Sequence, residues 1–69
     1  MERIALIGLG PHARRIYYPY LTDLTTSNDK FHLELVIDLD MNRQSIEEFL
    51  ENQSLRPKNI LYRNSKGQI

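Results

Sequence analysis

The chain has 69 residues, no cysteine, nine Lys and Arg against nine Asp and Glu, and 41% hydrophobic residues. The lack of cysteine excludes disulfides and thiolate metal sites, and two histidines are too few for a histidine-based zinc cage. Balanced charge argues against a general nucleic-acid binder, which carries a basic excess. No apolar run approaches the ~18 residues of a membrane span, and the N-terminus does not resemble a signal peptide. We therefore expect a cytoplasmic protein without a metal, nucleic-acid or membrane partner.

The chain opens on a predicted strand followed by a sharp turn. Residues 3–7 are almost continuously apolar, as in a strand that is buried on both faces of a parallel sheet. Gly8-Leu9-Gly10 ends this strand. Pro11 is favoured at the first position of a helix, where a backbone N–H has no partner, so a helix is expected to follow at once.

Residues 12–24 have the periodicity of a helix with one apolar face. Pro19 lies inside this stretch, and its missing N–H predicts that the helix kinks or ends early. Arg14 and Arg15 are adjacent, point to different sides and are expected to be solvated. The side chains expected to pack against the sheet are Ala13, Ile16, Tyr17, Tyr20, Leu21 and Leu24.

The remaining elements repeat this alternation. After a polar loop, a second strand is predicted over residues 32–37, with His32 at its edge, and a third over residues 60–62. A helix over residues 41–52 lies between them, and Asp40 or Asn42 is its expected N-cap. Arg43 could reach a phosphate, but it is expected on the solvated surface of that helix. The buried stripe of the helix is expected to consist of Ile46, Phe49 and Leu50. Residues 64–67 have the composition of a turn.

Strands that alternate with helices predict an α/β fold with a parallel sheet. The expected architecture is a partial Rossmann fold (β-α-β-α-β) with a three-stranded sheet of order 3-2-1. Residues 1–69 would then be the N-terminal half of a dinucleotide-binding domain, with the remainder and a substrate domain absent. The first strand would be an open edge, which predicts a homo-oligomer that forms through this strand.

One motif carries chemistry. Residues 8–13 fit G-x-G-x-x-A immediately after a predicted strand and at the start of a predicted helix. Gly8 permits the tight turn, Gly10 lets a pyrophosphate approach the backbone, and Ala13 lets the helix pack close to the strand. Pro11 and His12 occupy the variable positions, where the N-terminus of the helix offers N–H groups to phosphates. A tight turn that binds nothing is the alternative.

Asp38 stands at the carboxyl end of the second predicted strand, where the adenosine ribose of a dinucleotide lies. A carboxylate there accepts both ribose hydroxyl protons and repels a 2′-phosphate, which favours NAD over NADP. The separation of Gly8 and Asp38 exceeds the ~20 residues usual for the motif, and the polar loop over residues 25–30 accounts for the excess. A strand-end turn residue is the alternative role for Asp38, and Asp40 is expected to cap a helix.

These residues together resemble the start of the Gfo/Idh/MocA family of oxidoreductases, which continues its glycine motif as G-x-G-x-x-[AG]-x-x-x-H-x-P-x-L. Gly8, Gly10, Ala13, Pro19 and Leu21 match this frame. The second block, residues 33–40, is similar to the family's E-L-V-x-x-x-D-x-[DN] segment, with Asp38 on the position that usually meets the adenosine ribose. Tyr17 stands where the family commonly has histidine.

The resemblance implies an NAD(P)-dependent oxidoreductase that transfers a hydride between nicotinamide and a sugar- or polyol-like substrate. The family's Glu-Lys-Pro segment with its catalytic lysine is not in this sequence, so no catalytic residue is assigned and the chain alone is not expected to turn over. A non-catalytic nucleotide-binding or interaction domain remains open as an alternative. Methyltransferase-like and flavin-binding domains are disfavoured, because the loop lacks the glycines that they prefer.

Overall fold

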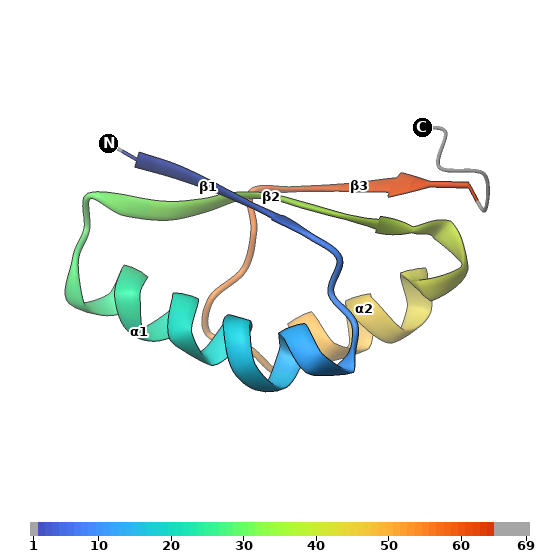
Figure 1. The fold of residues 1–69 in the computed structure, drawn as a ribbon, viewed down its shortest axis with the longest axis horizontal. Helices are drawn as coiled ribbons and strands as arrows, with labels where there is room; N and C mark the ends of the chain where they lie inside the picture. Colours follow the sequence, from blue (N-terminus) through green and yellow to red (C-terminus); the bar gives the residue numbers. More distant parts are fainter. Residues whose placement is uncertain (1, 65–69) are drawn as a thin grey trace.

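The computed structural model describes residues 2–64. Three strands alternate with two helical segments, and the α/β class predicted from the sequence is confirmed (Figure 1). The predicted turn over residues 64–67 lies mostly outside the described residues. The strands are β1 (Glu2–Ile7), β2 (Phe31–Leu39) and β3 (Asn59–Arg63), and the helices are α1 (Tyr18–Ser27) and α2 (Arg43–Glu51).

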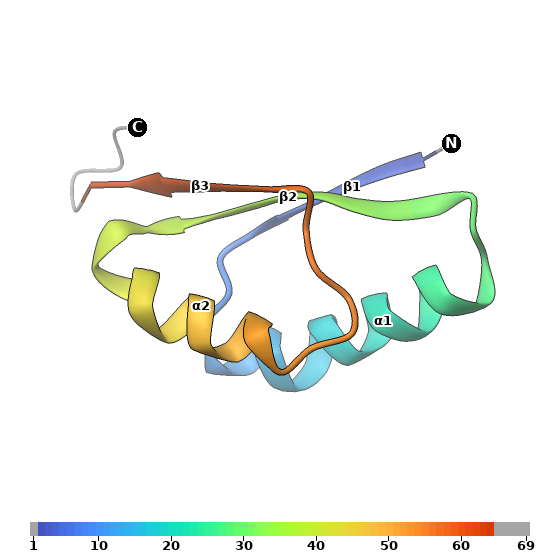
Figure 2. The same cartoon turned by 180° about the vertical axis from the view of Figure 1, so that it is seen from behind.

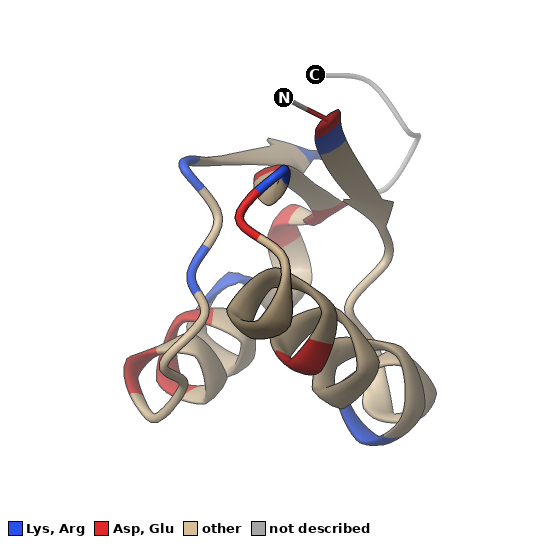
Figure 3. Ribbon diagram, turned by 90° about the vertical axis from the view of Figure 1, so that its left-hand side faces the viewer, with Lys and Arg blue, Asp and Glu red and all other residues tan. Residues whose placement is uncertain are grey.

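The three strands form one parallel sheet. Backbone pairing joins β1 to β2 and β2 to β3, so β2 is central and the order along the sheet is β1-β2-β3. Both helices lie on the same side of the sheet, as the two opposite views show (Figures 1 and 2). No described element covers the other side. Acidic and basic residues are interspersed along the ribbon, in keeping with the balanced charge (Figure 3).

A β-bulge in the central strand sets which side chains face the helices. The register runs from Ile4 opposite Leu33 directly to Ala5 opposite Leu35, so β2 has one extra residue at Glu34. Side chains alternate faces along a strand, and an extra residue reverses the alternation beyond it. Leu33, Val36 and Asp38 are consequently all buried, although the first two lie three positions apart.

The core lies between the sheet and the two helices. Side chains from β2, α1 and α2 meet there, together with one residue of the loop after β1. The predicted buried stripe of the second helix is confirmed, since Ile46 and Leu50 are buried and Phe49 packs against them. The buried apolar residues are Leu9, Tyr18, Leu21, Leu33, Val36, Ile46 and Leu50.

The first helix neither ends at Pro19 nor presents the predicted face. Helical backbone begins at Pro11 and runs without interruption to Ser27, but Ala13–Tyr17 forms a π-helical turn in which the Tyr18 N–H donates to the Ala13 carbonyl. Proline cannot donate an N–H to the preceding turn, and the wider π turn accommodates this loss.

The extra residue in the π turn changes which side chains of this helical segment face the core. Tyr18 is fully buried, whereas Ile16, Tyr17 and Tyr20 are 48%, 52% and 64% exposed. The prediction that these three residues pack against the sheet was therefore wrong. The prediction was right for Leu21, which is buried, and for Ala13, which packs against the core.

Candidate functional site

The candidate site lies where β1 and β2 end, at the carboxyl edge of the sheet. The Gly8 N–H donates to the Ile37 carbonyl at 2.7 Å, which extends the pairing of β1 and β2 by one residue. The chain then turns through Leu9 and Gly10 into the helix. The Arg14 N–H donates to the Gly10 carbonyl at 3.0 Å, so the helical hydrogen bonds start at the second glycine. The strand–loop–helix context that the motif requires is present.

The two glycines meet different requirements. Gly8 has a φ of +90°, a conformation that side chains with a Cβ rarely adopt, so its place in the turn depends on glycine. Gly10 has an ordinary φ, and a Cβ built on it would have no atom within 4 Å. The space above Gly10 is thus open in this fold. That opening is what a ligand needs to approach the backbone closely.

Leu9, between the glycines, fixes the loop to the body of the protein. Its side chain is 1% exposed and belongs to the core. Its N–H donates to Asp38 Oδ2 at 2.7 Å, and its carbonyl accepts from Arg14 Nε at 3.0 Å. Side chain, donor and acceptor are all engaged, so the loop is held in place without a ligand.

Asp38 is 7% exposed and contacts both the glycine loop and the segment that leads into α2. Besides the Leu9 N–H, its carboxylate accepts the Leu39 N–H at 2.6 Å and Asn42 Nδ2 at 2.9 Å, both on Oδ1. Burial by itself raises the pKa of Asp38, but the hydrogen bonds from Asn42, Leu9 and Leu39 outweigh burial and lower the pKa below its usual value. Asp38 is therefore ionised at neutral pH.

Two residues that sequence reasoning left out of the site hold this arrangement together. Arg14 was expected to be solvated, but its Nη2 donates to Ser45 Oγ at 2.9 Å and its guanidinium carbon lies 5.2 Å from the centre of the Phe49 ring. It thereby links the glycine loop to α2. Asn42 does occupy the N-cap position of α2, but its side chain makes no capping hydrogen bond and binds Asp38 instead. No sequence motif predicts the contacts of Arg14 with α2 or the hydrogen bond from Asn42 to Asp38.

Three side chains next to Asp38 form a cluster, which we call the arginine platform: Asp40, Arg43 and Tyr62. Arg43 Nε and Nη2 donate to Asp40 Oδ1 at 3.0 and 2.8 Å. The guanidinium carbon of Arg43 lies 4.1 Å from the centre of the Tyr62 ring. Tyr62 is the register partner of Asp38 across β2 and β3. Asp40 was expected to cap a helix, but it makes no capping hydrogen bond and binds Arg43.

The two histidines lie apart. His12 is in the first turn of the helix, with its ring edge-on to Tyr17 at a centroid distance of 5.4 Å. His32, at the other end of β2, places Nε2 3.0 Å from Glu34 Oε1, and this hydrogen bond is the main cause of the lowered pKa of Glu34. Only His12 belongs to the candidate site.

A cavity of about 400 Å³ lies at the opposite edge of the sheet, near the amino ends of β2 and β3. Thr25, Phe31, His32, Leu55 and Arg56 are among its lining residues, and no residue of the glycine loop takes part. The candidate site is an open surface at the carboxyl edge, and the cavity is separate from it.

Within residues 2–64, no three His, Asp or Glu side chains gather closely enough to hold a metal ion. The same part of the chain contains no helix that is long and apolar enough to cross a membrane.

Comparisons with models of protein families, with characterised proteins and with solved structures give no significant match.

Proposed function

We propose that residues 1–69 bind the ADP half of NAD and form the N-terminal half of the Rossmann domain of an oxidoreductase. The parallel strand order β1-β2-β3 is consistent with a partial Rossmann-like arrangement. The observation that carries the proposal is the hydrogen bond from the Leu9 N–H to Asp38 Oδ2. It brings together the two parts of the dinucleotide motif, which lie 29 residues apart in the chain.

The residues present fit this cofactor. Gly10 leaves room for the pyrophosphate, and the first turn of the helix, which opens on Pro11, supplies the N–H groups of His12 and Ala13, which lack partners within a helix. Asp38 is ionised and its Oδ2 accepts one hydrogen bond, so one further acceptor position remains for a ribose hydroxyl. By this count the Asp38 carboxylate can accept a hydrogen bond from one ribose hydroxyl, whereas the sequence led us to expect two. The negative charge of Asp38 favours NAD over NADP.

In an enzyme of the proposed family, the bound nicotinamide supplies hydride transfer to or from a sugar- or polyol-like carbon. The described residues contribute binding and orientation of the adenosine and pyrophosphate. None of them is proposed as a catalytic residue.

The first test uses Gly10→Val. Because a Cβ at Gly10 meets no atom within 4 Å and the φ is ordinary, we expect the free energy of unfolding to change by no more than about 0.5 kcal/mol. The valine side chain would fill the space proposed for the pyrophosphate, so we expect at least a tenfold loss of NADH affinity, about 1.4 kcal/mol. Fluorescence titration with NADH measures the affinity, and urea unfolding measures the stability.

Leu24→Val serves as a control, because it alters a partly buried helix residue away from the site. It should leave NADH affinity unchanged. Binding of NADH to the Gly10→Val variant with the affinity of the parent chain would contradict the proposed position of the pyrophosphate.

A non-catalytic interaction domain is the second candidate, and the hydrogen bonds of Asp38 favour it in one respect. Asp38 binds three donors of this chain itself, which is sufficient reason for a buried carboxylate at this position. Under this alternative the glycine loop is a structural turn. The two candidates differ in whether NADH binds to the parent chain.

We also propose that the chain forms a homo-oligomer through β1. Among the described strands β1 pairs only with β2, so its other edge is open, and Ile7 is 69% exposed. Sedimentation velocity should show a dimer or larger species for the parent chain, and Ala5→Lys, which adds a charge to the exposed part of this edge, should shift it toward monomer. Thr26→Lys adds the same charge to an exposed helix position and should change nothing. A monomeric parent chain at high concentration would refute this proposal.

A further inference from the structure

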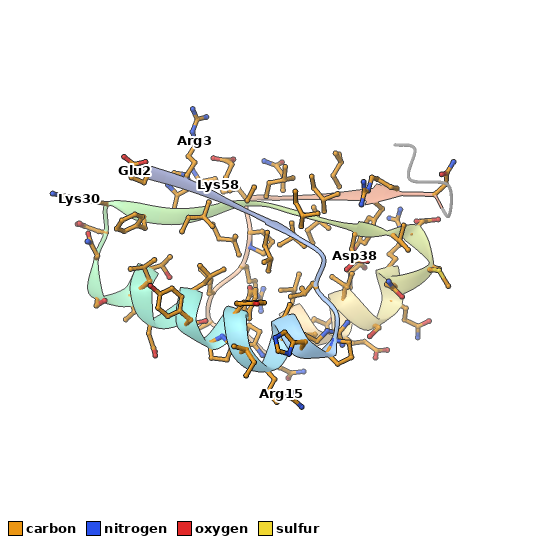
Figure 4. All side chains as sticks on the ribbon, viewed as in Figure 1. Glu2, Arg3, Arg15, Lys30, Asp38 and Lys58 are labelled. Carbon is orange, nitrogen blue, oxygen red and sulfur yellow. The ribbon has the colours of Figure 1, made fainter. Side chains whose placement is uncertain are left out.

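The cavity at the amino edge of the sheet is built by three parts of the fold. The last turn of α1 and the turn after it form one wall, the start of β2 lies at the base, and the loop between α2 and β3 forms the other wall. Figure 2 shows this loop rising to the sheet beside α1. Lys58, from the same loop, and Asp38 lie toward opposite ends of the sheet (Figure 4). The cavity therefore differs in place from the candidate site.

Three side chains give this cavity an apolar surface, which we call the apolar floor: Phe31, Leu33 and Leu55. Leu33 is buried in the core and Leu55 packs against the core. The Leu55 carbonyl also accepts the hydroxyl of Tyr18, which holds the loop against α1. The cavity volume of about 400 Å³ lies within the ~300–1,000 Å³ of small-molecule sites, which are mostly apolar with a few polar groups.

The two walls of the cavity carry charges of opposite sign. Asp29 belongs to the turn after α1, and Arg56 belongs to the loop before β3. Within residues 2–64 these two residues form no ion pair, with each other or with any other group. Thr25 and Thr26 also line the first wall, and the last carbonyls of a helix carry a partial negative charge. One wall thus favours a cation and the other an anion.

The guanidinium of Arg56 has donors to spare for a ligand. Its Nη2 donates to the Glu51 carbonyl at 3.0 Å, which anchors the side chain. Burial raises the pKa of Tyr18 to about 12, and the positive charge of Arg56 opposes this rise, so the charge acts on the inner side of the loop. A guanidinium has five N–H donors, and two of them together match a carboxylate. Lys58 adds a second positive charge to the lining.

We propose that this cavity binds a free α-amino acid with an apolar side chain, with its ammonium group at Asp29, its carboxylate at Arg56 and its side chain on the apolar floor. An amino acid carries both charges on one small skeleton, so it matches both walls at once. A plain carboxylate or a plain amine would match only one of them. The inference is independent of the proposed NAD-binding function, because no residue of the glycine loop lines the cavity.

The test compares L-leucine with three relatives that each lack one part of it. Isocaproate lacks the ammonium group, isopentylamine lacks the carboxylate, and glycine lacks the apolar side chain. Each is titrated into the full chain and followed by NMR chemical shifts. L-leucine should bind most tightly, and each relative should bind about tenfold more weakly or worse, because a charged hydrogen bond or an apolar contact is lost. The largest shift changes should fall in residues 25–33 and 54–58.

Two variants assign the charged groups to their walls. Arg56→Met should weaken L-leucine and isocaproate by about tenfold and leave isopentylamine within about twofold of the parent affinity. Asp29→Asn should weaken L-leucine and isopentylamine to a similar extent and spare isocaproate. Arg15→Met and Asp23→Asn are the matched controls, since both residues are exposed and neither lines the cavity. Arg15 points away from the sheet (Figure 4). Circular dichroism establishes that each variant is folded.

Three results would overturn the inference. The first is that L-leucine produces no saturable shift changes, or produces them away from the cavity. The second is that isocaproate or isopentylamine binds as tightly as L-leucine, since the site would then recognise a single charge. The third is that Arg56→Met and Asp29→Asn, correctly folded, bind L-leucine like the parent chain. The outcome does not depend on whether NADH binds, so this inference and the proposed function can fail separately.

Discussion

Replacing Tyr18 with alanine is expected to lower the free energy of unfolding by about 3–5 kcal/mol, the usual cost of removing a buried aromatic ring. Tyr18 is fully buried, its ring lies edge-on to Phe49 at a centroid distance of 5.2 Å, and its hydroxyl donates to the Leu55 carbonyl. The ring therefore joins α1 to α2, and the hydroxyl joins α1 to the loop before β3. Such a loss is comparable to the whole stability of a chain of this size.

The matched variant is Tyr17→Ala, which removes the same atoms one position earlier. Tyr17 is 52% exposed, so its replacement should cost no more than about 1 kcal/mol. Urea unfolding followed by circular dichroism measures both variants. Equal losses at the two positions would mean that the π turn does not set the register of this helix.

A milder variant keeps the comparison measurable if Tyr18→Ala does not fold. Tyr18→Phe retains the ring and loses only the hydrogen bond to Leu55, which should cost about 1 kcal/mol.

The pH dependence of stability offers a further measurement, because burial raises the pKa of Tyr18 to about 12. The neutral hydroxyl is favoured in the folded state, so it contributes to the free energy of unfolding. This contribution is fully present below the ordinary pKa of about 10 and is lost as the pH rises from there toward about 12. The phenylalanine variant should lack this alkaline component.

Replacing Asp38 with asparagine is expected to impair both stability and NADH binding. The amide cannot accept all three hydrogen bonds that the carboxylate accepts, and a hydrogen bond to a charged group contributes about 1.5–3 kcal/mol. We expect a loss of that size at neutral pH. Because the ribose hydroxyl is proposed to bind the same carboxylate, NADH affinity should fall by at least about tenfold.

The pH dependence identifies Asp38 as the source of this stability. The folded pKa of Asp38 is lowered, so its contribution is present above the unfolded value of about 3.9 and disappears as the pH falls through the lower folded value. The difference in unfolding free energy between the parent chain and Asp38→Asn should therefore shrink in acid. Asp23→Asn, at an exposed helix position, should give no such difference. A difference that is constant from pH 7 to about pH 2 would rule out this account.

The same variant separates the two candidate functions. A loss of stability in a parent chain that binds no NADH would leave Asp38 as a purely structural residue. A loss of NADH affinity in a variant that remains folded would support the cofactor role.

Local patterns were sufficient to predict the order of strands and helices. The apolar run of β1, the glycine turn and Pro11 each have a local physical cause, and all three lie where the sequence placed them. The contact between the glycine loop and Asp38 was also predictable, because the carboxyl ends of neighbouring parallel strands meet at one edge.

Other features depend on contacts between distant parts of the chain or on the helix as a whole. The π turn changes which tyrosine is buried, and a period of 3.6 residues cannot represent it. Arg14 and Arg43 have the sequence surroundings of solvated residues, yet one binds Leu9 and Ser45 and the other lies over Tyr62. Only the folded chain shows these partners.

The bulge at Glu34 determines how insertions and deletions between the glycine loop and Asp38 would affect the position of the Asp38 side chain. Because side chains alternate along a strand, the face on which Asp38 lies depends on whether an odd or an even number of residues separates it from the paired start of β2. Residues added to or removed from the turn before β2 leave that parity untouched. Loss of a single residue between Leu33 and Asp38 would direct the carboxylate to the side of the sheet that no described element covers. The long interval between the glycine loop and Asp38 is thus tolerated, and the constraint on this site is parity rather than distance along the chain.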